Sequence, residues 1–143
     1  MSKINQKGNT YLIDTFSGFK EEEKYHKKDM FIFTDIAELK KNIKNFRLKK
    51  INILQQKFPN EERLKTIKNI KLCHIDVNTY KSTKNSYDYV KNKVIKGGFI
   101  IFDDYGILGV EMVVKFVNQI KLKDKKKFFF INNYMGQCIL IKK

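Results

Sequence analysis

The stretch from Leu72 to Tyr105 constrains the fold more than any other part of the sequence. Two apolar runs, 70–77 and 99–102, are separated by a segment, 82–95, that is long enough for one crossover helix. This pattern predicts a strand–helix–strand unit with parallel strands. Acidic residues stand at the carboxyl ends of both strands, where open α/β sheets bind their ligands. These residues are Asp76, Asp103 and Asp104.

Strands and helices alternate along most of the chain. Alternation of this kind implies right-handed crossovers and a mostly parallel sheet, which is an α/β fold. Only residues 133–136 separate the last two strands, so we expect an antiparallel hairpin there. The glycine pair 97–98 is expected to break the chain just before the strand that follows it. The expected strands are 10–14, 51–55, 70–77, 99–103, 127–132 and 137–142, and the expected helices are 35–48, 60–68, 82–95 and 109–120.

Three of the expected helices carry apolar residues at three- and four-residue spacing, which is typical of one buried stripe. The first also has Asp35 and Glu38 at the spacing of a capping box. The short helix 60–68 follows Pro59, and Asn60 is expected to cap it. The predicted stripes are Ile36, Leu39, Ile43 and Phe46; Tyr87, Val90 and Val94; and Val110, Val113, Val114 and Val117.

Length and composition fit one globular domain. The chain has 143 residues and a hydrophobic content of 42%. No apolar run has the length of a membrane span, and residues 1–10 are too polar for a signal peptide, so we expect a cytoplasmic protein without a membrane partner. Cys73 and Cys138 lie in apolar runs and are expected to be reduced core residues rather than a disulfide or a metal pair.

The net charge of +15 raises the question of a nucleic-acid partner. Of the 30 basic residues only Arg47 and Arg63 are arginines. Arginine is the residue type favoured for bidentate hydrogen bonds to phosphates and for contacts to the edges of bases. The lysines are spread among asparagine and isoleucine residues. This distribution indicates a compositional bias rather than a binding patch, so a basic nucleic-acid-binding protein is the less favoured alternative.

Three segments carry motifs. Tyr11–Phe19 reads YLIDTFSGF, His74–Thr83 reads HIDVNTYKST, and Gly97–Tyr105 reads GGFIIFDDY. In this order they resemble the macrocin O-methyltransferase (TylF-type) family, which uses S-adenosylmethionine. The family's corresponding motifs are Asp-Thr/Ser-Phe-x-Gly after a hydrophobic run, Asp-x-Asp-x-Tyr-x-Ser-Thr, and Gly-Gly-(apolar)-Asp-Asp-Tyr. The resemblance runs from about Asn9 to the end of the chain, and three motifs in order are more specific than any one alone.

The resemblance implies a Rossmann-like methyltransferase fold with a cofactor site. Asp14 matches the acidic residue at the end of the family's second strand, whose carboxylate accepts hydrogen bonds from the ribose hydroxyls of S-adenosylmethionine. Thr15 and Phe16 follow it in the same motif and are expected to border the cofactor.

The resemblance also implies a magnesium site, because Asp76, Asp103 and Asp104 match the family's metal ligands. Mg²⁺ prefers oxygen ligands and keeps several waters. The ion would bind neighbouring hydroxyls of a sugar and make one easier to deprotonate. The sulfonium methyl group would then pass in line to that oxygen. The implied substrate is a sugar-containing small molecule or glycan precursor, such as a nucleotide-linked sugar.

One motif departs from the family at its catalytic position. Asn78 stands where the family usually has a second aspartate, the candidate general base. An amide has no useful basicity, so it cannot take the proton. Either another group or a metal-bound hydroxide does so, or the step is impaired. Asn78 also fits a second interpretation, in which it only caps the turn that follows.

The family's Gly-rich first-strand motif has no counterpart before Tyr11, where only Gly8 is available. The resemblance places that strand at the centre of the sheet, between strands 10–14 and 70–77. We therefore expect residues 1–143 to form a single incomplete domain, lacking the first central strand. Unpaired strand edges invite association. Either the two half-sheets pair directly, or a second polypeptide or a second copy of the chain completes the sheet.

Several features have simpler interpretations. His74 lies inside a strand and is expected to be a packed core residue, and His26 a solvated loop residue. The run Phe128–Phe130 is expected to be a buried strand. The alternatives to an O-methyltransferase or its remnant are a non-catalytic fragment that completes its sheet with another chain and the nucleic-acid binder. A metal-dependent phosphoesterase would need histidines and a second metal site that the pattern lacks.

Overall fold

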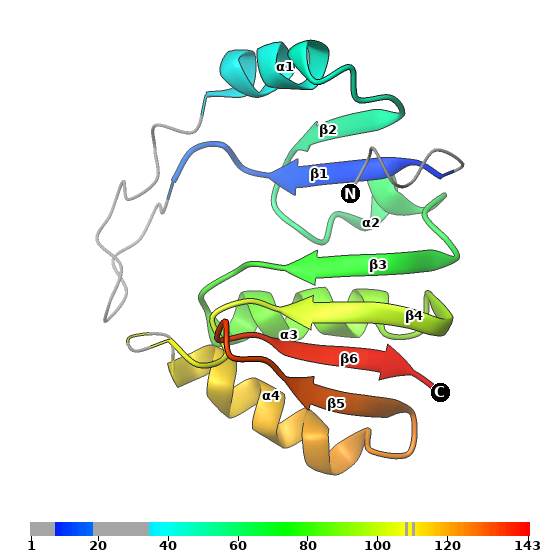
Figure 1. Cartoon of the computed structure of the whole chain (residues 1–143), viewed down its shortest axis with the longest axis vertical. Coiled ribbons are helices and arrows are strands. Elements are labelled where there is room, and N and C mark those ends of the chain that lie inside the picture. Colours follow the sequence, from blue (N-terminus) through cyan, green and yellow to red (C-terminus); the bar gives the residue numbers. More distant parts are fainter. Residues whose placement is uncertain (1–7, 19–34, 108, 110) are drawn as a thin grey trace. The chain divides into compact units, whose positions relative to one another are not determined.

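The computed structural model describes residues 8–18, 35–107, 109 and 111–143. The chain divides into two units, Met1–Phe58 and Pro59–Lys143, and each is described by itself. The order of strands and helices is the predicted one (Figure 1). None of the described helices combines the length and the apolar character needed to cross a membrane. His26 and Val110 lie outside the described residues, and the single incomplete domain stays a prediction.

The first unit pairs two parallel strands, β1 (Thr10–Asp14) and β2 (Ile51–Gln55). The crossover between them contains α1 (Ile36–Asn45). Asp35 caps this helix, because its carboxylate accepts a 2.6 Å hydrogen bond from the Ala37 backbone N–H. Both strands and the helix cap were predicted from the sequence.

The predicted stripe of α1 is half-buried at Ile36, Leu39 and Ile43 and is wrong for Phe46. No residue of α1 is buried, and Phe46, which follows its last turn, is 59% exposed. The apolar spacing is that of an amphipathic helix, but a two-stranded sheet offers too little surface to cover the apolar face.

The second unit is a four-stranded sheet with helices packed on one face (Figure 1). The strand order is β3–β4–β6–β5. β3 and β4 are parallel, and β6 runs antiparallel to both of its neighbours. This confirms the predicted α/β class with a closing hairpin. The elements are α2 (Glu61–Leu64), β3 (Ile70–Ile75), α3 (Tyr80–Val90), β4 (Val94–Phe102), α4 (Glu111–Lys123), β5 (Phe128–Asn132) and β6 (Cys138–Lys142).

Some bounds in this unit differ from the prediction. α3 ends at Val90 and β4 begins at Val94, so Val94 is buried in a strand rather than in a helix. The glycine pair lies inside β4 instead of breaking the chain before it. Gly97 has a φ of +75° and the register with β3 shifts here, so the strand continues through a bulge. α2 is shorter than predicted, and Asn60 makes no side-chain capping bond.

The core of the second unit lies between the sheet and α3 with α4. Tyr87 of α3 is 1% exposed and lies at the centre of an aromatic cluster. Its ring centroid is 6.0 Å from that of Phe102, 5.7 Å from that of Phe116 and 6.2 Å from that of Phe128. These rings come from α3, β4, α4 and β5, so one cluster joins both helices to the sheet.

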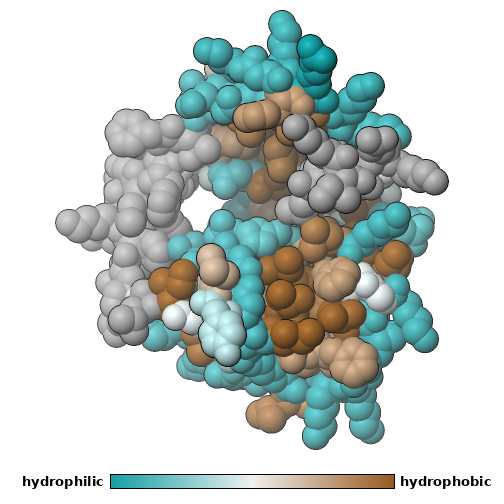
Figure 2. Space-filling view, in the orientation of Figure 1, coloured by the Kyte–Doolittle hydropathy of each residue, from teal (hydrophilic) through white to brown (hydrophobic). Residues whose placement is uncertain are grey.

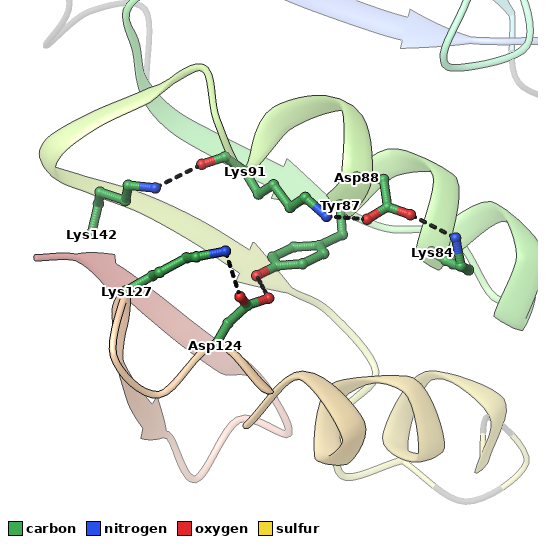
Figure 3. A network of polar contacts seen from close by, with 7 residues as sticks. All are labelled: Lys84, Tyr87, Asp88, Lys91, Asp124, Lys127 and Lys142. Atoms are coloured by element: carbon green, nitrogen blue, oxygen red, sulfur yellow. Dashed lines mark hydrogen bonds and ion pairs between the residues drawn. The ribbon is translucent and has the colours of Figure 1, made fainter. Parts of the chain in front are cut away.

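The buried Tyr87 hydroxyl is satisfied by a carboxylate (Figure 3). It donates a 2.7 Å hydrogen bond to Asp124 Oδ2, while Lys127 Nζ lies 3.0 Å from Asp124 Oδ1. A buried polar group costs free energy unless it is hydrogen-bonded, so this pair fixes the end of α4 against α3. Other ion pairs and a backbone contact in the same view involve Lys84, Asp88, Lys91 and Lys142.

Within the described part of the chain, the opposite face of this sheet carries exposed apolar side chains. One row crosses all four strands: Leu72 pairs with Phe99, Phe99 with Ile141, and Ile141 with Phe129. Leu72, Phe99 and Phe129 are 38%, 40% and 58% exposed. Figure 2 shows hydrophobic side chains gathered over these strands. The expectation that Phe128–Phe130 is a buried strand therefore holds for Phe128 and is wrong for Phe129.

The strands form two sheets, β1–β2 and β3–β4–β6–β5. Within the described part of the chain, neither β1 nor β3 has a second strand partner. The division falls where the resemblance places the missing central strand. The fold is therefore a partial one.

Candidate metal and cofactor site

The carboxyl ends of β3 and β4 bring two predicted metal ligands side by side. Ile75 lies opposite Phe102, and the Asp103 backbone N–H donates a 3.0 Å hydrogen bond to the Ile75 carbonyl. Asp76 and Asp103 are the next residues of the two strands. Since side chains alternate along a strand, both project to the face that carries His74, away from α3 and α4.

The structure groups His74 with Asp76 and Asp103. One ligand atom from each residue lies within 4.8 Å of the other two, and His74 Nε2 is 3.4 Å from Asp103 Oδ2. The prediction that His74 is packed in the core is wrong, because its side chain is 31% exposed on the face that the helices leave open. The spacing of two residues between His74 and Asp76 is the sequence signal for this grouping.

Asp103 is held in place from the closing hairpin. Its Oδ1 atom accepts a 3.1 Å hydrogen bond from Gln137 Nε2 and a 3.2 Å bond from the Asp104 backbone N–H. The Asn133 side-chain amide donates a 2.9 Å bond to Gln137 Oε1 and so fixes Gln137 in turn. These bonds engage Oδ1 and direct Oδ2 towards His74. No sequence signal indicates Gln137, because its partner lies 34 residues away.

Asp104, the third predicted ligand, is not one of the three residues whose ligand atoms converge. Its φ is +59°, a left-handed conformation that aspartate tolerates better than most residues, and its carbonyl accepts a bond from the Ile107 N–H. The Tyr105 hydroxyl then anchors the loop to α4, 2.8 Å from Asn118 Oδ1 and 2.7 Å from Lys121 Nζ. The Asp-Asp-Tyr motif thus places one carboxylate, turns the chain and fixes the loop. Asp104 as a ligand stays a prediction.

The loop after β3 is fixed by the hydroxyl groups of its own motif. Thr79 caps α3, because its side-chain oxygen accepts a 3.0 Å bond from the Ser82 N–H. The buried Thr83 hydroxyl lies 3.1 Å from the Val77 carbonyl and 2.7 Å from the Thr79 carbonyl. Asn78 is half-buried in this loop, and the helix cap is its neighbour Thr79. The role of Asn78 at the position of the family's base stays a prediction.

The predicted cofactor residues lie in the first unit, at the carboxyl end of β1. Asp14 Oδ1 accepts a 2.7 Å hydrogen bond from the Phe16 backbone N–H, and Phe16 has a φ of +51°. The Thr15 carbonyl accepts a 3.3 Å bond from Gln55 Nε2. These bonds hold a tight turn and give the Asp14 carboxylate a defined direction. Cofactor binding by Asp14, Thr15 and Phe16 stays a prediction.

Neither cysteine is suited to act as a nucleophile. Both thiols are free, with Cys138 buried and Cys73 half-buried. Burial raises the pKa of Cys73 to about 12 and that of Cys138 to about 11, so both are protonated at neutral pH. The predicted core position is confirmed for Cys138, while Cys73 is only half-buried.

The group of His74, Asp76 and Asp103 fits a divalent cation. Carboxylates and imidazole are direct metal ligands in proteins. The 3.4 Å between His74 Nε2 and Asp103 Oδ2 is close to the roughly 3 Å that separates adjacent ligands of an octahedral ion. Because the side chains are partly open to solvent, coordination positions remain for water or for substrate hydroxyls. Cation binding at these strand ends is the chemistry that the arrangement supports.

The fold belongs to the methyltransferase class. The structure of the O-methyltransferase NovP matches with a TM-score of 0.79 at 17% identity, covering 99% of this chain and 62% of NovP. The calicheamicin methyltransferase CalS11 matches with a TM-score of 0.73 at 14% identity, covering 98% and 63%. SMU.1697c from Streptococcus mutans, in complex with SAH, matches with a TM-score of 0.58 at 12% identity, covering 94% and 89%. The chain spans less than two thirds of NovP and CalS11.

A family model for macrocin-O-methyltransferase (TylF) matches residues 2–129. The chain belongs to this family, as the resemblance indicated. The matched region contains all three motifs and all the predicted site residues. No curated protein sequence matches the chain significantly.

Proposed function

We propose that this chain forms the metal-binding part of an S-adenosylmethionine-dependent sugar O-methyltransferase, or of a remnant of one, that uses Mg²⁺ or a similar divalent cation. The observation that carries the proposal is the convergence of Asp76 and Asp103 at adjacent strand ends in a TylF-family chain. A sugar substrate is supported by the neighbour CalS11, which is described as a TDP-rhamnose 3′-O-methyltransferase. The substrate class is a glycan precursor or nucleotide-linked sugar.

In this proposal Asp76 and Asp103 hold the cation. Asp104 is a further ligand, and its match to the family motif is the support for that role. A cation held there would bind neighbouring sugar hydroxyls and lower the pKa of one of them. Gln137 keeps Asp103 in the orientation that coordination requires. Asn78 cannot accept the proton, so another group takes it. Most of the catalytic effect would come from positioning.

Asp14 has a separate task, which is to accept hydrogen bonds from the ribose hydroxyls of the methyl donor, with Thr15 and Phe16 beside it. Calorimetric titration of SAH into the full chain with Mg²⁺ tests this task. We expect one SAH per chain. Asp14→Asn should lower the affinity for SAH about tenfold, because one charge-assisted hydrogen bond is lost. Asp35→Asn is the matched control, since Asp35 also accepts a backbone N–H but lies in no motif. No binding at millimolar SAH would contradict a self-sufficient enzyme.

Transfer of labelled methyl groups tests the substrate class. TDP-linked deoxysugars with neighbouring hydroxyls should accept label from S-adenosylmethionine, and Asp76→Asn should abolish the transfer. Analogues with only one of those hydroxyls should react poorly, because the cation could not be chelated. Equal labelling of both kinds of sugar would contradict the proposed role of the metal.

A second candidate is a non-catalytic unit that completes its sheet with another polypeptide or a second copy of the chain. The edge position of β3 favours strand pairing, and the partly exposed apolar row at Leu72 and Phe99 offers a face for the partner to cover. Light scattering of the full chain should then show association that Phe99→Lys weakens. Leu122→Lys, at a 77% exposed position on α4, is the control that should leave association unchanged. A stable monomer at high concentration would count against this candidate.

A further inference from the structure

We infer that the site at the ends of β3 and β4 takes a first-row transition-metal cation such as Mn²⁺ in preference to Mg²⁺, because His74 supplies an imidazole nitrogen as a third ligand. The inference deepens the proposed function and rests on its metal-binding part. It does not depend on methyl transfer by this chain.

The backbone places the imidazole where a ligand is needed. His74 and Asp76 are two residues apart on β3, so their side chains share a face of the sheet. Asp103 follows the parallel strand β4, one residue beyond the pairing of Ile75 with Phe102. Three donors from two neighbouring strand ends therefore converge, with one ligand atom of each residue within 4.8 Å of those of the other two.

The three side chains need to move little to surround an ion. His74 Nε2 and Asp103 Oδ2 are already 3.4 Å apart, against roughly 3 Å for adjacent ligands around an octahedral cation. The remaining adjustment is a side-chain rotation of a partly exposed group, since His74 and Asp103 are 31% and 27% exposed. Three ligands on one side leave the other positions open to water or sugar hydroxyls.

The donor set does not match the preference of magnesium. Mg²⁺ is bound through oxygen and demands near-ideal octahedral geometry, whereas imidazole suits the later divalent cations. Affinity for a site with nitrogen and oxygen ligands rises from Mn²⁺ to Cu²⁺ and falls again at Zn²⁺. One nitrogen in place of an oxygen therefore shifts the site away from Mg²⁺. The oxygens of Asp76 and Asp103 keep it suited to the harder members of the series, such as Mn²⁺.

Asp103 is oriented for this role by bonds to its other oxygen. Oδ1 accepts from Gln137 Nε2 and from the Asp104 N–H, so Oδ2 is the atom presented to His74 and to a cation. Bonds of this kind to the non-coordinating side of a ligand fix its direction and are a regular part of metal sites. A simple surface ion pair between His74 and Asp103 would not need them.

The test compares Mn²⁺ and Mg²⁺ binding by calorimetry in the full chain and in two variants. His74→Gln removes the imidazole and keeps an amide that can still donate to Asp103. His26→Gln is the matched control, because the chain has only two histidines. We expect the wild-type chain to prefer Mn²⁺ at least about tenfold, and His74→Gln to lose most of that preference while His26→Gln retains it. Thermal melting confirms that each variant is folded.

Electron spin echo envelope modulation of bound Mn²⁺ gives a readout that a structural role would not change. A coordinated imidazole produces nitrogen modulation, which should be present in the wild-type chain and in His26→Gln and absent in His74→Gln. The inference would be overturned if bound Mn²⁺ showed no nitrogen modulation in the wild-type chain. It would also be overturned if the wild-type chain and His74→Gln preferred Mn²⁺ equally. Either result would leave the carboxylate part of the proposed site standing. Absence of any divalent binding would overturn the inference together with that part, while SAH binding would still be decided by its own titration.

Discussion

Gln137 donates a 3.1 Å hydrogen bond from its side-chain amide to Asp103 Oδ1, and so ties the closing hairpin to the end of β4. It reinforces the 3.2 Å bond that the same oxygen accepts from the Asp104 backbone N–H. With Oδ1 engaged, Oδ2 faces His74 at 3.4 Å. The candidate metal group therefore depends on the turn between β5 and β6, which holds none of its ligands.

Gln137→Ala should weaken Mn²⁺ binding by about 10- to 100-fold, the usual effect of losing a group that orients a ligand. Calorimetry measures the change. Gln119→Ala is the matched control, because the Gln119 side chain accepts a hydrogen bond from the Tyr80 hydroxyl, away from the metal group. Equal affinity in Gln137→Ala and Gln119→Ala would show that Gln137 does not orient Asp103.

Gly98→Ala should disturb the register that places Asp76 beside Asp103. A Cβ at residue 98 would lie 2.8 Å from Val94 Cγ1, 2.9 Å from the Ile95 carbonyl oxygen and 3.0 Å from the Ile70 carbonyl oxygen. Two of these contacts are with backbone, so the strands must shift. We expect a loss of about 1–3 kcal/mol in the free energy of unfolding.

Urea denaturation measures the Gly98→Ala effect, and metal affinity should fall with stability. Lys96→Ala is the control, since Lys96 is an exposed residue of the same strand. A Gly98→Ala variant as stable as Lys96→Ala would contradict the close approach of β3 and β4 at the bulge.

The elements of the second unit were predictable because their signals are local. Apolar runs, the helical spacing between them and the four-residue hairpin connection gave the order of strands and helices along the chain. The glycine pair was misjudged, because glycine in sequence indicates either a break or a bulge, and only pairing with β3 decides between them. Val94 was assigned to a helix since helical spacing from Val90 continues by chance into the strand.

Tyr87→Phe should destabilise the second unit by about 1–2 kcal/mol, because the carboxylate of Asp124 loses its 2.7 Å donor in a mostly buried place. The ring, and with it the aromatic cluster, is retained. Chemical denaturation measures the difference. Tyr134→Phe is the matched control at a fully exposed position and should change stability by less than about 0.5 kcal/mol. Equal effects would mean that the Tyr87 hydroxyl bond contributes nothing.

Stability should decrease as the pH falls below about 4, in part through Asp124. Burial alone would raise the pKa of Asp124, but the hydrogen bonds from Tyr87 and Lys127 outweigh it, so the pKa lies below its ordinary value. A depressed folded-state pKa contributes stability above the unfolded-state pKa, and this contribution is lost as the pH falls through the folded-state value.

Asp124→Asn should therefore lower stability at neutral pH and flatten its decline under acid conditions. Unfolding free energies measured from neutral to acid pH give both quantities. An unchanged acid slope in Asp124→Asn would contradict the depressed pKa.

The candidate site was only partly predictable from the sequence. Asp76 and Asp103 follow apolar runs, so their place at strand ends could be inferred. The two-residue spacing puts His74 on the same face as Asp76, but finding that this face is open requires knowing that the helices cover the side of Ile75. Gln137 depends on a contact across the sheet that no local pattern encodes.

The most direct test of the account is a calorimetric titration of Mn²⁺ into the full chain and its Asp76→Asn and Asp103→Asn variants. Asp88→Asn is the control, since Asp88 pairs with Lys84 and Lys91 on α3 and lies outside the metal group. We predict one Mn²⁺ per chain, with affinity reduced at least about tenfold in Asp76→Asn and Asp103→Asn and unchanged in Asp88→Asn. Wild-type affinity in both Asp76→Asn and Asp103→Asn would contradict it.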